Sequence, residues 1–251
     1  MIASLLAQSG DPSNVIEWFQ DGDDRALSGP IFEQLLITLQ HSLTALVIAV
    51  AVAVPLAIVL AHYRKAEVAA AAVINVGRAV PTVAILGILV LVFIAAGQGF
   101  SSGPIVLALV LLALPPLFTN TYASVLGVDA GAVSAARAMG FNERELMLRV
   151  ELPLALPIIF TGVRIAAVQV IATEPLAAFF GGDGLGVYLR QGLGNQDFNE
   201  VQAGALLVTA TAIGMDFLLY LLGRAVFPKG VQHSAAGRAP RRTKHPTPIP
   251  R

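Results

Sequence analysis

Three charged side chains interrupt the long apolar stretches of this 251-residue chain, and they are the groups that could do chemistry inside a membrane. They are Arg164, Glu174 and Asp216. A charge inside a bilayer is costly, so such a residue either pairs with an opposite charge or serves transport. At about 1.5 Å per residue, Arg164 and Asp216 lie roughly 13 Å and 9 Å from the same membrane face. We therefore expect these two residues to form an intramembrane ion pair.

Glu174 lies near the opposite face, about 28 Å along its span. The next residue, Pro175, removes a backbone donor and can kink the helix. Two interpretations of this position stay open. In the first, Glu174 and Pro175 belong to a translocation path or gate, where the carboxylate attracts a cation. In the second, Glu174 is an interfacial residue that contacts water or a loop.

Other residue types give little support for catalysis or for a resident cofactor. The chain has no cysteine, and its four histidines are not spaced as a metal site. No Gly-Lys-Ser/Thr ending of a phosphate-binding loop occurs, and the glycine-rich run 182–186 lacks lysine. An intramembrane enzyme would need a Ser–His or metal-binding constellation, which the apolar segments lack. We therefore expect no catalytic residue, metal or cofactor in this chain.

The elements that carry these residues are apolar helices. Hydrophobic residues make up 56% of the chain and charged residues 13%, against about a quarter in soluble domains. The mean hydropathy is +0.74. A helix needs about 20 mainly apolar residues to cross a bilayer. By this measure the sequence predicts an all-α membrane protein with five transmembrane helices, at about 36–61, 79–97, 104–126, 155–178 and 203–222.

Arginine and lysine are divided unequally between the two membrane faces. With the N-terminus outside, the outer segments hold two basic residues, Arg25 and Arg190, and the inner segments hold thirteen. Because basic loops stay in the cytoplasm, we expect an outer N-terminus and a cytoplasmic C-terminus. Residues 1–30 then form an extracytoplasmic segment, 31–226 the transmembrane domain and 227–251 a disordered basic tail. The net charge of +0 gives no case for binding nucleic acid.

The cytoplasmic loop at 127–153, between the third and fourth spans, has helical character. Asp129 can cap a helix whose apolar residues recur at helical spacing, and a second amphipathic turn follows at 146–150. The pattern predicts a helical hairpin that lies against the membrane and presents small residues to a cytoplasmic protein. These small residues are Ala135, Ala136 and Gly140.

This loop resembles the coupling loop in permease subunits of ATP-binding cassette (ABC) importers. The family pattern is Glu-Ala-Ala, three residues, Gly, nine residues, Ile, one residue and Leu-Pro. The matching positions are Ser134, Ala135, Ala136, Gly140, Val150, Leu152 and Pro153. All spacings agree, with Ser134 in place of the acid and Val150 in place of Ile. The resemblance implies a type I ABC importer permease fold, in which these residues couple the permease to an ATPase.

The longer stretch 75–186 resembles permeases of osmoprotectant importers, which move glycine betaine, carnitine, choline or proline. The resemblance lies mainly in 79–87, 149–157 and 176–186. It implies a subunit of the prokaryotic inner membrane, in contact with lipid, that works by alternating access. The implied partners are two cytoplasmic ATPases that bind ATP and Mg²⁺, a second permease copy or a related permease, and a separate extracytoplasmic substrate-binding protein.

Two other transport functions are alternatives. An ABC permease for a different small polar solute would share the same coupling loop. An ion-coupled secondary transporter would use Arg164, Glu174 and Asp216 as a relay, although that class often has two repeated halves, which we do not find in five spans.

Overall fold

The computed structural model describes residues 15, 18–19, 30–63, 81–98 and 101–227. Its elements, in chain order, are α3 (Pro30–His62), α5 (Thr82–Ala95), α6 (Ser102–Leu126), α7 (Ala130–Ala138), α8 (Glu143–Leu146), the π-helical turn η1 (Met147–Glu151), α9 (Leu152–Thr173), the 3-10 helix η2 (Glu174–Phe180), α10 (Gly186–Asn195) and α11 (Phe198–Val226). These residues contain no strand, as the predicted all-α class requires. Most of the predicted N-terminal segment and nearly all of the predicted tail lie outside the described residues.

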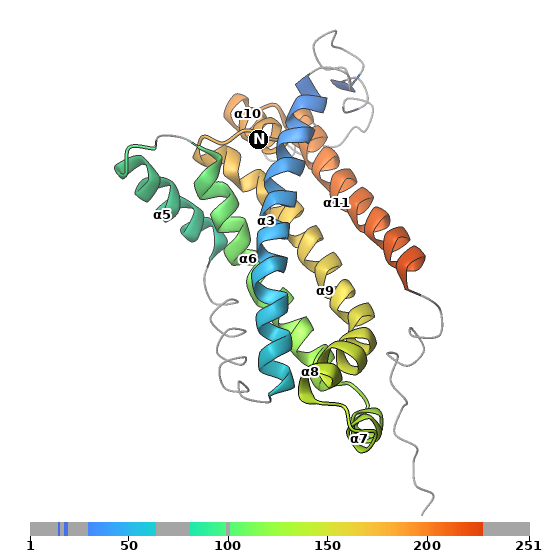
Figure 1. The fold of residues 1–251 in the computed structure, drawn as a ribbon. Coiled ribbons are helices and arrows are strands. Elements are labelled where there is room, and N and C mark those ends of the chain that lie inside the picture. The colour runs from blue at the N-terminus through green and yellow to red at the C-terminus, as the bar shows by residue number, and fades with distance from the viewer. Residues whose placement is uncertain (1–14, 16–17, 20–29, 64–80, 99–100, 228–251) are drawn as a thin grey trace, which may run out of the picture.

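Three helices, α3, α6 and α9, run side by side through the molecule, with α5 against α6 and α11 against α9 (Figure 1). The first two run in the same direction and α9 returns in the opposite one. The short helices α7 and α8 lie together at one end of this bundle, called here the hairpin end, and α10 lies at the other, called the α10 end. Both ends of α9 therefore lie close to α3.

A seam of small residues lets α3 pack closely. Alanine is buried at every fourth position along it: Ala45, Ala49, Ala53, Ala57 and Ala61. Four residues are close to one helical turn, so these side chains share one face. Small residues allow the close helix approach on which packing in membranes depends. The helix that lies most extensively against α3 is α6, and the two form the centre of the main apolar core.

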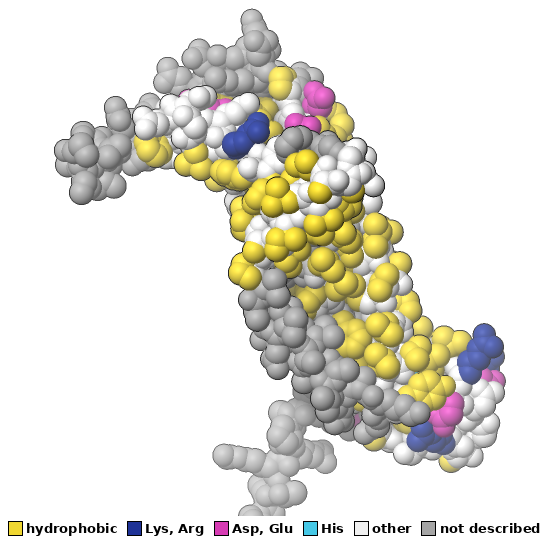
Figure 2. Space-filling view, turned by 90° about the vertical axis from the view of Figure 1, so that its left-hand side faces the viewer, with side chains coloured by type: hydrophobic (Ala, Val, Ile, Leu, Met, Phe, Trp, Pro, Cys, Tyr) yellow, Lys and Arg dark blue, Asp and Glu magenta, His cyan; other side chains and the backbone are white. Residues whose placement is uncertain are grey.

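Many large hydrophobic side chains are exposed on the outer surface of the described residues, as expected for a protein in contact with lipid. Four helical segments are long and apolar enough to cross a bilayer, and α5 is a shorter apolar helix. On the face seen in Figure 2, hydrophobic side chains cover the middle of the described residues, and charged side chains lie toward the two ends. Each of the five predicted spans overlaps one apolar helix of the described residues. The helix α5 has 14 residues and is shorter than the predicted span 79–97, whereas α3 and α11 extend beyond theirs at both ends.

Two elements differ from the sequence prediction. The fourth span changes at Glu174 from an α-helix to the 3-10 helix η2, which contains Pro175. The helix α10 was not predicted, because its glycines and polar residues hide any apolar period. Its Tyr188 packs against Trp18 of the N-terminal segment, with ring centroids 5.7 Å apart.

Candidate functional site

Glu174 forms a buried polar centre at the α10 end. Only 1% of this residue is exposed, and two side chains of α3 hold its carboxylate. The Thr38 hydroxyl donates to Oε2 at 2.9 Å, and His41 Nδ1 lies 3.0 Å from Oε1. The carboxylate is therefore not in contact with water, unlike in the interfacial interpretation. It joins the end of the fourth span to the first.

A glycine turn closes over this carboxylate. Gly184 has a φ of +106°, which favours glycine, and an added Cβ would lie 2.7 Å from both Glu174 Oε1 and Thr38 Oγ1. Its N–H donates to Gln34 Oε1 at 2.6 Å, and the Leu185 N–H donates to Thr38 Oγ1 at 2.8 Å. The glycine-rich run is thus a turn fastened to α3. Thr38 both donates and accepts, so it links the turn to the carboxylate.

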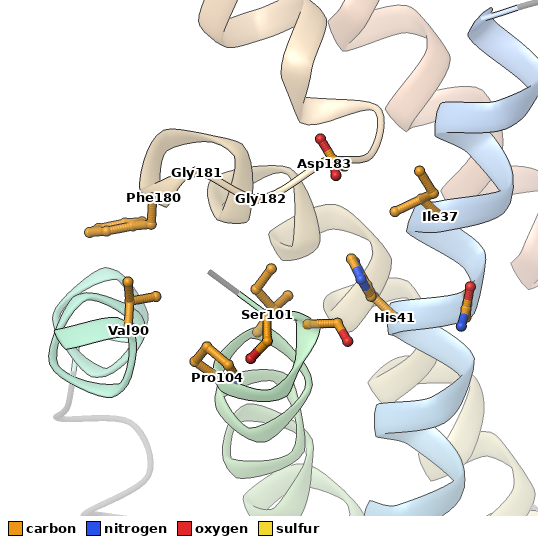
Figure 3. A pocket seen from close by; sticks show the side chains of 12 residues that line it. Ile37, His41, Val90, Ser101, Pro104, Phe180, Gly181, Gly182 and Asp183 are labelled. Carbon is orange, nitrogen blue, oxygen red and sulfur yellow. The ribbon is translucent and has the colours of Figure 1, made fainter. Parts of the chain in front are cut away.

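A cavity of about 260 Å³ opens beside this centre (Figure 3). His41 lies on its wall, together with Phe180 and Asp183 from the end of η2. The start of α6 contributes its N-cap residue Ser101 and its first residue Ser102. Among the lining residues that the structure describes there is one acidic side chain and neither lysine nor arginine. This lining of acidic, aromatic and hydroxyl groups suits a small cation with polar substituents.

Arg164 and Asp216 lie together between α9 and α11. Arg164 Nε and Nη2 lie 3.1 Å and 2.8 Å from Asp216 Oδ1, and Nη2 lies 2.9 Å from Oδ2. This two-pronged arrangement is the strongest geometry for a guanidinium and a carboxylate. The Tyr220 ring covers the guanidinium, with its centroid 5.3 Å from Arg164 Cζ. Both charges have partners, so neither is a free group inside the membrane.

The hairpin at the other end is built from local caps. Asp129 accepts from the N–H groups of Gly131 and Ala132 and starts α7, as its position predicts. Gly140 turns the chain with a φ of +89°, and Asn142 and Glu145 form a capping box that starts α8.

The residues of the predicted coupling set do not all face outward. Ser134, Ala135, Gly140 and Pro153 are exposed, and Val150 and Leu152 are half-buried. The expectation that Ala136 belongs to the exposed small surface is wrong, because this residue is 2% exposed. Successive residues of a helix point about 100° apart, so Ala136 packs inward while its neighbour Ala135 faces outward.

A charged network that the sequence analysis missed connects the hairpin to α3. His62 Nδ1 lies 2.6 Å from Glu151 Oε2, and His62 Nε2 lies 3.3 Å from Glu143 Oε2. Arg137 Nη2 lies 3.1 Å from the same Glu143 oxygen. A cavity of about 460 Å³ borders this network. The available indication was a histidine at the end of an apolar span. Its partners Glu143 and Glu151 lie more than 80 positions away, and no spacing rule connects them to it.

The arrangement of the helices places this chain in a known class of membrane protein. The chain has the fold of type I ABC importer permeases. It superimposes on the permease of a methionine ABC transporter with a TM-score of 0.68 at 19% identity, covering 77% of this chain and 94% of that one. An amino acid ABC transporter solved with histidines gives a TM-score of 0.66 at 18% identity, covering 86% and 99%.

The family follows from the sequence comparison. Residues 53–230 match the binding-protein-dependent transport system inner membrane component, and the chain belongs to this family. It is 34% identical to a carnitine transport permease of Listeria monocytogenes over 81% of this chain and 92% of the relative. It is 35% identical to a glycine betaine/carnitine/choline permease of Bacillus subtilis, over 76% and 86%. A choline permease of the same organism is 34% identical, over 80% and 91%. The protein is therefore a multi-pass permease of the ABC importer type.

Proposed function

We propose that this chain is the permease subunit of an ATP-driven importer that moves a small osmoprotectant such as glycine betaine, choline, carnitine or proline into the cell. The observation that carries this proposal is the identity of about one third, over at least three quarters of the chain, to permeases named for carnitine, glycine betaine and choline. These three solutes share a trimethylammonium group. A different small polar solute would use the same fold, so substrate choice needs its own test.

The cavity beside His41 is the proposed part of the translocation path in this chain. The side chains around it suit a cation, because Asp183 is exposed at the cavity edge and Phe180 offers an aromatic ring. We propose that Glu174 and Pro175 belong to the path or gate, with Glu174 acting through His41. Glu174 is buried behind His41, so it orients that imidazole and does not contact the solute directly.

The other functions of the importer are proposed to belong to partner proteins, one of which docks on the hairpin. The hairpin residues Ser134, Ala135, Gly140, Val150 and Pro153 are proposed to receive an ATPase pair, which binds ATP and Mg²⁺. Ala136 and Leu152 support that surface from inside. A second permease copy or a related permease and an extracytoplasmic binding protein complete the assembly. The subunit lies in a prokaryotic inner membrane, with its N-terminus outside and its C-terminus in the cytoplasm.

Uptake of labelled glycine betaine tests the proposal. Cells that lack the gene and cells with the gene restored are compared at low and high osmolarity, with choline, carnitine and proline as competitors. Restored uptake is the expected result, and the competitors then rank the substrates. Uptake that does not depend on the gene, from a permease that still co-purifies with an ATPase, would retain the importer class and refute the substrate. Uptake driven by an ion gradient without ATP would favour the secondary-transporter alternative.

A further inference from the structure

Two histidines of α3, His41 within the helix and His62 at its last residue, each contact a glutamate next to an end of α9. His62 contacts Glu151, which directly precedes α9, and His41 contacts Glu174, which directly follows it. The two histidines are 21 positions apart, so about 31 Å of helix separates them. That length is close to the roughly 30 Å hydrocarbon thickness of a bilayer. The two helices are therefore joined at two levels about 31 Å apart, and each junction is a histidine–glutamate contact.

At the hairpin end, the junction continues into both helices of the coupling hairpin. His62 also contacts Glu143 at the start of α8, and Glu143 contacts Arg137 of α7. The side chain of His62 is 2% exposed and that of Glu151 10% exposed, so solvent ions screen their contact little. His62 therefore contacts both the start of α8 and the residue before α9. It adds a direct ionic contact between α3 and the hairpin to the packing of α3 against α6 and α9.

At the α10 end, the junction borders the cavity. His41 lies on the cavity wall and Glu174 lies behind it. Thr38 and Gln34, one and two turns before His41, hold the glycine turn that leads into Asp183 and the cavity rim. A shift of α3 therefore moves one wall of the cavity and the turn over it at the same time.

We propose that His62 is a positioning residue that transmits movement of the coupling hairpin to the cavity about 31 Å away, with α3 and α9 moving as one body joined at both ends. A long helix is rigid because its backbone hydrogen bonds hold each turn to the next, so a tilt at one end moves the other end. His62 supplies the direct ionic attachment of this helix to the hairpin, beside the packing of α3 against α6 and α9. The inference rests on the proposed function, since the movement comes from ATPases that dock on the hairpin.

The test uses the absence of cysteine in this chain. Ser101→Cys places a thiol at the cavity with little change in shape, since Ser101 is an exposed lining residue. The permease is purified with its ATPase and reconstituted in lipid vesicles. The rate at which fluorescein maleimide labels the permease band is then measured without nucleotide and with ATP plus vanadate. With His62 present, we expect nucleotide to change this rate by about fivefold or more.

His62→Ala should reduce the nucleotide effect to within about twofold while the ATPase remains bound. His62→Gln keeps an amide that can donate to both glutamates, so it should restore most of the effect. Val59→Ala is the matched control, because it truncates an exposed side chain near the same end of α3 and touches neither junction. A full nucleotide effect in His62→Ala would overturn the proposal.

Should His62→Ala fail to accumulate in the membrane, Glu143→Ala replaces it, because this exposed residue supplies the hairpin side of the same contact. Loss of the nucleotide effect then supports the proposal and its full retention overturns it. Failure of the proposed function has a different outcome. The Ser101→Cys permease with His62 intact would then bind no ATPase and would show no response to nucleotide.

Discussion

Thr38 is the residue that holds the buried centre at the α10 end together. Its hydroxyl donates to Glu174 and accepts from the Leu185 N–H, so its loss leaves two buried groups with one partner fewer. We expect Thr38→Val to lower the free energy of unfolding by about 1 to 3 kcal/mol. The measurement is thermal unfolding of the detergent-purified permease, followed by circular dichroism.

Thr44→Val is the control for that change, because Thr44 is exposed on the same helix. This control should alter stability by no more than about 0.5 kcal/mol. Thr38→Ser, which keeps the hydroxyl, should behave like the unaltered protein. Equal stability of Thr38→Val and Thr44→Val would show that the bridging hydroxyl contributes nothing.

The second prediction at the residue scale concerns Arg164 and Asp216. Asp216→Asn leaves the guanidinium without a charged partner, and Arg164→Met leaves the carboxylate without one. We expect each single change to reduce folded yield and stability. The double change of Arg164→Met with Asp216→Leu should reduce them less, because it leaves no unpaired charge. A double-mutant cycle on unfolding, built from Arg164→Met, Asp216→Leu and the two combined, should give a coupling of about 0.5 to 3 kcal/mol. Additive effects, or normal assembly and transport in Asp216→Asn, would argue against a structural pair.

The sequence allowed prediction of some of these contacts and not of others. Depth along two apolar helices places Arg164 and Asp216 at the same level, because a constant rise per residue converts position into depth. No such rule brings Thr38 and His41 to Glu174, which lies more than 130 positions away and outside the regular α-helix. A single histidine inside an apolar helix does not indicate from the sequence which residue it contacts. Contacts of this kind become visible only after the helices are packed.

At the scale of elements, the turn between α7 and α8 is the most sensitive part of the hairpin. Gly140 has a φ of +89°, and an added Cβ would meet nothing within 4 Å. Gly140→Ala therefore introduces backbone strain of about 1 to 3 kcal/mol without a steric clash. We expect the strain to change the angle between the two helices and to weaken ATPase binding about tenfold. The measurement is the amount of ATPase recovered with the tagged permease.

The matched control is Gly194→Ala in α10. An added Cβ there also meets nothing within 4 Å, but Gly194 has no positive φ. Its replacement should leave stability unchanged or raise it by about 0.4 to 1 kcal/mol, with normal ATPase recovery. Normal recovery with Gly140→Ala as well would show that the geometry of the turn does not govern docking.

Elements that cross the bilayer were predictable, because the required apolar length follows from membrane thickness. The caps of α7 follow similarly from Asp129, since a side-chain oxygen at that position satisfies free N–H groups. The π-helical turn at Met147–Glu151 has no comparable sequence pattern. It nevertheless lies where Glu151 contacts His62, so the irregular backbone coincides with the contact that sequence analysis missed.

At the scale of the whole molecule, the direction of insertion can be tested with two cysteines. Ser101 lies at the α10 end and Ser134 in the hairpin, and both are exposed. The distribution of arginine and lysine predicts that the hairpin end faces the cytoplasm. In intact spheroplasts, a membrane-impermeant maleimide should label Ser101→Cys. It should label Ser134→Cys only after the membrane is permeabilised. The opposite pattern would show that the predicted orientation is wrong.

The alanine seam of α3 restricts how this helix can move. A repeat of four residues exceeds the 3.6 residues of a helical turn, so the line from Ala45 to Ala61 winds slowly around the helix. One step along it measures about 6 Å. A smaller slide against the neighbouring helix would press side chains against one another at several levels, whereas a tilt of α3 together with α6 keeps every alanine in place. The seam therefore favours rocking of the α3–α6 pair over a piston movement of α3.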